Sequence, residues 1–69
     1  MAFVIKANDR GQIGWISPLN HRGFRSLVDR AKAAVFPSRE EAQRAIDQLP
    51  EAFARAGIRL SIEPGEADP

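Results

Sequence analysis

Apolar residues, many of them β-branched or aromatic, gather in two short stretches near the start of the chain. Residues 3–7 (Phe-Val-Ile-Lys-Ala) read as a strand with Phe3, Ile5 and Ala7 on one face, and residues 13–17 (Ile-Gly-Trp-Ile-Ser) read as the returning strand. Between them, residues 8–11 read Asn-Asp-Arg-Gly, which are residue types that favour a turn. The pattern predicts a β-hairpin, and Pro18 ends its second strand because proline cannot donate to a sheet ladder.

The next part of the chain shows no such regularity. We expect an exposed loop over residues 19–25, followed by either a short helical turn or irregular backbone over residues 26–31. Residues 33–36 (Ala-Ala-Val-Phe) are then predicted to form a short third strand, which Pro37 ends.

A capped helix is predicted over residues 39–56. Ser38 precedes Glu41 by three positions, which is the spacing of a capping box: the Ser38 hydroxyl accepts from the Glu41 N–H, and the Glu41 carboxylate accepts from the Ser38 N–H. Apolar residues then recur at helical spacing. They are Ala42, Ala45, Ile46, Leu49, Phe53 and Ala56.

Pro50 interrupts this stripe without shifting its phase. Two geometries satisfy the pattern. One is a single helix kinked at Pro50, and the other is a break that leaves Pro50 in the first turn of a second short helix. In both, Gly57 is suited to end the helical stretch.

Apolar and polar residues alternate over residues 58–63, which predicts a half-buried fourth strand. The order of the elements is therefore β-β-β-α-β. We expect an α+β fold, with a four-stranded, mostly antiparallel sheet in the spatial order fourth, first, second, third strand. The Pro-bent helix covers one face, and a right-handed crossover makes the third and fourth strands parallel. Residues 1–63 form the single domain, and residues 64–69 form a flexible tail.

Because one helix covers only one face of a sheet, the second face is expected to be solvated or used for binding. We expect Phe3, Ile5 and Ala7 to face the helix and Lys6 to face away. The apolar residues expected on the uncovered face are Val4, Ile16 and either Trp15 or Val35.

The composition limits what a domain of 69 residues can do. It contains no cysteine, no tyrosine and one histidine, His21, which lies among basic neighbours. We therefore expect no enzyme activity, no metal site, no cofactor and no small-molecule substrate. The sequence shows no export signal and no membrane-spanning run, which predicts a cytoplasmic protein.

Charge is unevenly distributed along the chain. Residues 1–39 contain seven Lys or Arg and two Asp or Glu, whereas residues 40–69 contain three and seven. The basic half includes a segment, residues 21–32, in which an aromatic lies among cations. The candidate binding residues are Arg22, Phe24, Arg25, Arg30 and Lys32, with Trp15 of the second strand. The alternative is a solvated loop with Phe24 and Leu27 in the core, and with Trp15 as a core residue.

The stretch Ala34-Val35-Phe36-Pro37-Ser38-Arg39-Glu40-Glu41-Ala42 resembles a junction found in small uncharacterised bacterial and phage α+β domains, where a strand ending in an aromatic leads into a capped helix. Together with the hairpin, it is also distantly similar to the arm-type DNA-binding domain of tyrosine recombinases. That resemblance implies a three-stranded sheet packed against one helix and a role in DNA binding.

These observations favour a non-catalytic interaction module that acts by macromolecular association. We expect a protein partner or a homodimer paired through an edge strand. One alternative is nucleic-acid binding through the basic residues 21–32, and another is a phage-type inhibitor of a nucleic-acid-handling defence complex. No membrane partner is expected.

Overall fold

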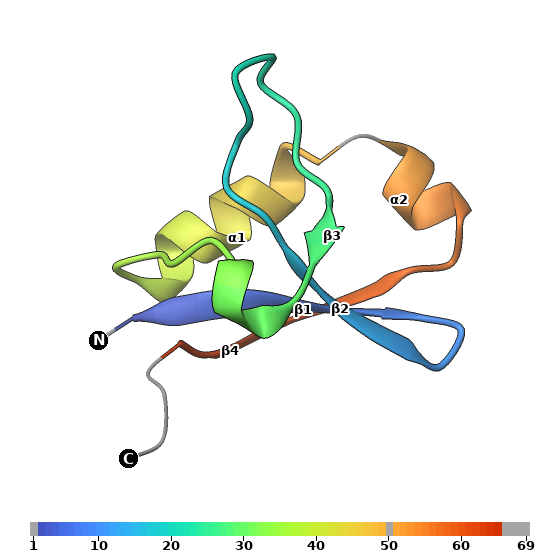
Figure 1. Ribbon diagram of the computed structural model, residues 1–69, viewed down its shortest axis with the longest axis horizontal. Helices are drawn as coiled ribbons and strands as arrows, with labels where there is room; N and C mark the ends of the chain where they lie inside the picture. Colours follow the sequence, from blue (N-terminus) through green and yellow to red (C-terminus); the bar gives the residue numbers. More distant parts are fainter. Residues whose placement is uncertain (1, 50, 66–69) are drawn as a thin grey trace.

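The predicted hairpin forms the centre of a four-stranded antiparallel sheet with the strand order β3-β2-β1-β4. The computed structural model describes residues 2–49 and 51–65 (Figure 1). Along the chain the elements are β1 (Phe3–Asp9), β2 (Gln12–Ile16), β3 (Leu27–Val28), a 3-10 turn η1 (Arg30–Lys32), α1 (Arg39–Asp47), α2 (Glu51–Arg55) and β4 (Arg59–Pro64). The α+β fold and the order β-β-β-α-β are as predicted, and so is the spatial order of the strands.

The hairpin turn has the geometry that matches the twist of a two-stranded ribbon. Asp9 pairs with Gln12, so only Arg10 and Gly11 lie between the strands, and both have positive φ, 55° and 94°. This is the two-residue loop in which both central residues are left-handed. The side chain of Asn8 accepts a hydrogen bond from the Gly11 N–H at 2.8 Å, which fixes the turn.

The third strand is not where the pattern placed it. Residues 33–36 were predicted to form it, but β3 is Leu27–Val28, where Trp15 pairs with Val28. The prediction over residues 26–31 missed this strand because two residues are too few to show an alternating pattern.

Residues 34–36 instead fill a gap between β1 and β2. The pairing of the two strands ends at Trp15, beyond which β2 diverges. Phe36 exchanges two backbone hydrogen bonds of 2.8 Å with Phe3, and the Ala34 N–H donates to the Ile16 carbonyl at 2.9 Å. The segment thus satisfies backbone groups that the divergence of β2 leaves free.

The prediction of a parallel pair within the sheet is wrong. Residues Phe3–Asn8 of β1 pair antiparallel with β4, and every strand pair of the sheet is antiparallel. A parallel pair would have required residues 33–36 to be the third strand, whereas β3 is Leu27–Val28. Phe36 and β4 do run in the same direction, since both are antiparallel to β1, but β1 separates them.

The helical region is broken rather than kinked. The Ser38 hydroxyl accepts from the Glu41 N–H at 3.2 Å, as predicted, although the described hydrogen bonds do not include the reciprocal one. Helix α1 ends at Asp47 and α2 begins at Glu51, so helix does not continue through residues 48–49. Pro50 itself lies outside the described residues.

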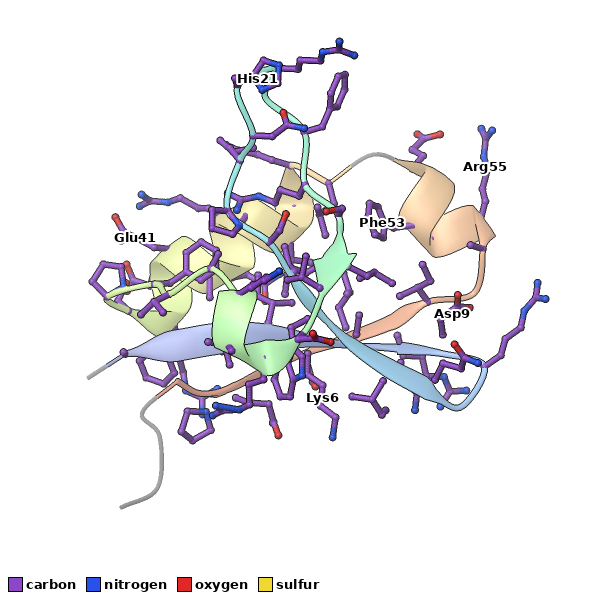
Figure 2. The ribbon with its side chains drawn as sticks, viewed as in Figure 1. Lys6, Asp9, His21, Glu41, Phe53 and Arg55 are labelled. Carbon is purple, nitrogen blue, oxygen red and sulfur yellow. The ribbon has the colours of Figure 1, made fainter. Side chains whose placement is uncertain are left out.

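Helix α1 packs over β1 and β4 and closes the core (Figure 1). Among residues 2–49 and 51–65, the largest fully buried side chains are Ile5 and Ile16, and they lie against Ala42 and Ala45 of α1. Around them pack Phe3, Phe36, Ile46, Leu49, Phe53, Leu60 and Ile62. Ile16 was expected on the uncovered face. It lies in the core because its neighbour Trp15 pairs with Lys6, which points away from α1 (Figure 2).

The second face of the sheet is partly covered. Val4 is only 2% exposed, although its position in β1 directs it away from the helix. Above this face, the Arg30 side chain of η1 reaches the Pro64 carbonyl of β4 at 3.0 Å. Arg30 thus covers the part of this face near Trp15 and Pro64, whereas Ile13 and Ser61 of the same face are exposed.

Strand β4 ends one residue later than the predicted fourth strand, which ended at residue 63. Strand β4 includes Pro64, and the Gly65 N–H donates to the Ala2 carbonyl at 2.8 Å. The predicted tail beyond that, residues 66–69, lies outside the described residues. Among the helices of residues 2–49 and 51–65, none combines the length and apolar character needed to cross a bilayer.

Candidate functional site

The loop that joins β2 to β3 projects from the body of the domain (Figure 1). Its tip is organised by Asn20, whose side-chain oxygen accepts from the N–H groups of Arg22 at 2.8 Å and Phe24 at 3.0 Å. The Asn20 backbone also donates to the Phe24 carbonyl at 2.8 Å and accepts from the Gly23 N–H at 2.9 Å. Gly23 has a φ of 81°, which favours glycine. The four hydrogen bonds define one compact turn.

The base of the loop is closed by two serines. The Ser17 N–H donates to the Ser26 carbonyl at 2.9 Å, and the Ser26 N–H donates to the Ser17 hydroxyl at 2.9 Å. These bonds continue the β2–β3 pairing beyond the last strand residue. The direction of the loop is therefore fixed by the sheet.

The Arg25 side chain makes its contacts within the domain. Its guanidinium donates to the Ser17 carbonyl at 3.0 Å and lies 5.5 Å from the centroid of the Phe36 ring. Desolvation by burial lowers the pKa of Arg25 from its usual value. Of the predicted binding residues, Arg25 thus holds the loop against the core rather than pointing freely toward a partner.

Apolar side chains gather at the outer part of the loop. Phe24 is 60% exposed and Leu19 is 58% exposed, which contradicts the alternative of Phe24 in the core. His21 lies at the far end of the loop (Figure 2), and Arg22 is exposed beside it. We call Leu19, His21, Arg22 and Phe24 the tip surface.

A shallow hollow of about 300 Å³ lies between the loop and the end of α1. Its lining consists of Leu19, Gly23, Phe24, Arg25, Gln48 and Leu49. The break after α1 contributes two of these residues, so the broken helix shapes the hollow. A partner side chain that entered it would contact Leu19 and Phe24.

The remaining predicted binding residues lie elsewhere. The Arg30 guanidinium is 5.2 Å from the centroid of the Trp15 ring, on the sheet face opposite α1, and Lys32 is exposed in the same 3-10 turn. Trp15 is half-buried under this arginine. The structure therefore divides the predicted set into the loop residues Arg22, Phe24 and Arg25 and a second group around η1.

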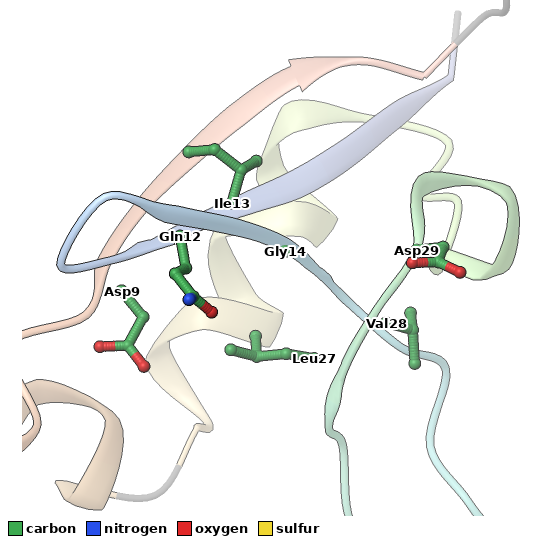
Figure 3. Close-up of a pocket in the computed structure, with 7 residues that line it drawn as sticks. All are labelled: Asp9, Gln12, Ile13, Gly14, Leu27, Val28 and Asp29. Atoms are coloured by element: carbon green, nitrogen blue, oxygen red, sulfur yellow. The ribbon is translucent and has the colours of Figure 1, made fainter.

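A second hollow, of about 210 Å³, lies along β2 and β3. Figure 3 shows Asp9 and Asp29 at its opposite ends, with Leu27 between them. A Cβ at Gly14 would lie 3.3 Å from the Cβ of Leu27, so glycine permits the close approach of β3 at this point. The separated carboxylates do not form a pair suited to acid–base chemistry.

Leu19 and Asn20 were not among the predicted binding residues. A signal for Asn20 was present, because the pattern Asn-x-Arg-Gly occurs twice, in residues 8–11 and in residues 20–23. In both places the Asn side chain accepts backbone N–H groups within the following turn. The repeat indicates that residues 20–23 form an ordered turn.

The tip surface offers apolar contact, cationic contact and a defined shape. Within residues 2–49 and 51–65, no group of three or more His, Cys, Asp or Glu residues could hold a metal ion. Comparisons of the chain with models of protein families, with curated proteins and with solved structures find no match.

Proposed function

We propose that the chain is a non-catalytic protein-binding module and that the tip surface is its binding site. The observation that carries this proposal is the exposure of Phe24, 60%, on a turn fixed by four hydrogen bonds to Asn20. A turn whose backbone is already fixed loses little conformational entropy on binding, so the apolar contact area of a residue on it contributes more to affinity. Aromatic and arginine side chains are also the residues that most often dominate protein interfaces.

The chemistry of the tip surface defines the partner that fits it. Leu19 and Phe24 require an apolar side chain, which would enter the hollow beside Leu49. Arg22 is exposed on the same tip surface and would pair with a carboxylate of the partner. The partner is thus a protein segment in which an apolar anchor lies next to an acidic residue.

One observation favours nucleic-acid binding as a second candidate: Phe24 lies two residues from Arg22, so a base could stack on the ring while the arginine contacts phosphate. The internal bonds of Arg25 and Arg30 weaken this candidate, because each donates to a backbone carbonyl. Fewer cations are left to follow a phosphate backbone.

The proposal is tested by capturing binding partners from a cell lysate on three immobilised proteins. These are the wild type, Phe24→Ser and the control Val35→Ser. Val35 is 61% exposed, a fraction close to that of Phe24, and lies outside the loop, so its substitution removes exposed apolar surface elsewhere. We expect a protein that both wild type and Val35→Ser retain and Phe24→Ser loses, with or without nuclease treatment. With the purified partner, Phe24→Ser should weaken binding at least about tenfold.

Two results contradict the proposal. One is a set of retained proteins that is identical for all three baits. The other is binding that nuclease treatment abolishes. Its affinity would fall steeply with salt, by about 0.9 log unit per log unit of salt for each phosphate contacted. This second result would support the nucleic-acid candidate instead.

A further inference from the structure

Strand β4 is a terminal strand of the sheet. Within the described residues it pairs with β1 on one side, and no strand pairs with its other side. An edge of this kind presents unpaired backbone groups on which another strand can add. Which groups these are follows from the pairing of β1.

Phe3 identifies the residues of β4 that face outward. It directs both its N–H and its carbonyl to Phe36, on the side of β1 away from β4. The Phe3–Pro64 pair is therefore one without mutual hydrogen bonds, and the pairs alternate along an antiparallel ladder. Counting back from Pro64, Ile62 and Leu60 direct their backbone groups outward, whereas residues 59, 61 and 63 direct theirs to β1.

The free part of this edge is bounded on both sides. The Ile58 N–H is already used, since it donates to the Phe53 carbonyl at 3.2 Å. At the other end, Pro64 has no N–H, and its carbonyl accepts from Arg30 at 3.0 Å. The available stretch is residues 59–63, and its centre is Ser61.

We propose that this edge pairs antiparallel with β4 of a second copy of the chain, with Ser61 opposite Ser61. In this register Leu60 lies opposite Ile62 of the second copy. Both direct their backbone groups to the new interface, so the two symmetric pairs supply four hydrogen bonds. Their half-buried side chains would extend the core across the interface.

The same register brings opposite charges together. Arg59 lies opposite Glu63 of the second copy, and the two-fold symmetry repeats this pair. Both are at positions without mutual backbone bonds, where side chains of neighbouring strands approach most closely. A strand that carried like charges at positions 59 and 63 would repel its own copy. This complementarity selects a second copy as the occupant of the edge.

Variants that exchange the charges at positions 59 and 63 test the proposal, with self-association measured by sedimentation equilibrium. Concentrations up to about 1 mM are needed, because a single strand pair gives a small interface and a weak dimer. Arg59→Glu alone and Glu63→Arg alone should each weaken self-association about tenfold or more, because each places like charges opposite one another. A mixture of the two variants should restore dimers, since every pair in the mixed dimer is then opposite in charge.

Cross-linking tests the register. The chain has no native cysteine, so Ser61→Cys should form a disulfide-linked dimer under mild oxidation. Arg59→Cys should not, because the two copies of residue 59 would be roughly 14 Å apart. Phe24→Ser should leave dimerisation unchanged, which separates this proposal from the proposed binding site. A wild-type chain that stays monomeric at about 1 mM, or single variants that associate as strongly as wild type, would overturn the proposal.

Discussion

The Arg30 guanidinium lies 5.2 Å from the centroid of the Trp15 ring, and the same side chain donates to the Pro64 carbonyl at 3.0 Å. Two residues that the sequence marked as binding residues are thus engaged with each other. Through this contact Arg30 links η1 to β2 and to β4, across the sheet face opposite α1.

Replacing Arg30 with Ala should expose the Trp15 ring and lower the free energy of unfolding by about 0.5–1 kcal/mol, the range for a cation–π contact at an exposed site. Trp15 is the only tryptophan, so its fluorescence reports the change directly as a shift to longer wavelength. Lys32→Ala, in the same 3-10 turn, is the control and should leave the spectrum unchanged. Equal spectra for both variants would show that Arg30 does not cover the ring in solution.

The burial of Ile16 predicts a contrast with Ile13 of the same strand. Ile16 is fully buried and Ile13 is 51% exposed. Ile16→Ala should lower the free energy of unfolding by about 2–5 kcal/mol, because it leaves a cavity against α1. Ile13→Ala should cost much less, which urea unfolding of both variants would measure. A larger loss for Ile13→Ala than for Ile16→Ala would indicate that the register of β2 is wrong by one residue, because such a slip exchanges the two faces of the strand.

Arg10, in the turn between β1 and β2, has a backbone conformation in which glycine should be more stable. Arg10 has a φ of 55°, a left-handed conformation that costs a non-glycine residue about 1 kcal/mol or more. Arg10→Gly should therefore raise the melting temperature, whereas Gly11→Ala, at a φ of 94°, should lower it. A lower melting temperature for Arg10→Gly would argue against this turn type.

As the N-cap of α1, Ser38 should contribute about 1 kcal/mol to the free energy of unfolding, because its hydroxyl accepts a hydrogen bond from the Glu41 N–H. Ser38→Ala tests this by thermal unfolding. Ser61→Ala, at an exposed strand position, is the matched control and should have a small effect. If the two variants melt at the same temperature, the capping bond contributes nothing measurable.

The longer elements could be predicted because each carries its own signal. The hairpin has two apolar stretches separated by turn residues, and α1 has a capping serine with apolar residues on one face. Strand β3 could not be predicted, since two residues show no period and their place depends on tertiary pairing with β2. Tertiary pairing also explains why residues 33–36 do not form the predicted third strand. Phe36 pairs with Phe3 of β1 instead.

The candidate site could be predicted only in part. A cluster of cations with an aromatic was visible in residues 21–32, but the sequence does not show which arginines bond internally. Arg25 contacts Phe36 and Arg30 contacts Trp15 because the loop and η1 fold back onto the sheet. Phe24 and Arg22 stay exposed because the turn at Asn20 directs them outward.

The central claim is that the tip of the loop is held in one shape before any partner arrives. Backbone order parameters from ¹⁵N relaxation of the Arg22 and Phe24 amides test it most directly, with β1 as the internal reference. We expect values of about 0.85 at both amides, equal to those of the strand, and a clear fall in an Asn20→Ala variant. Values below about 0.6 in the wild-type protein would contradict the claim, because a mobile tip could not present Phe24 in a fixed position.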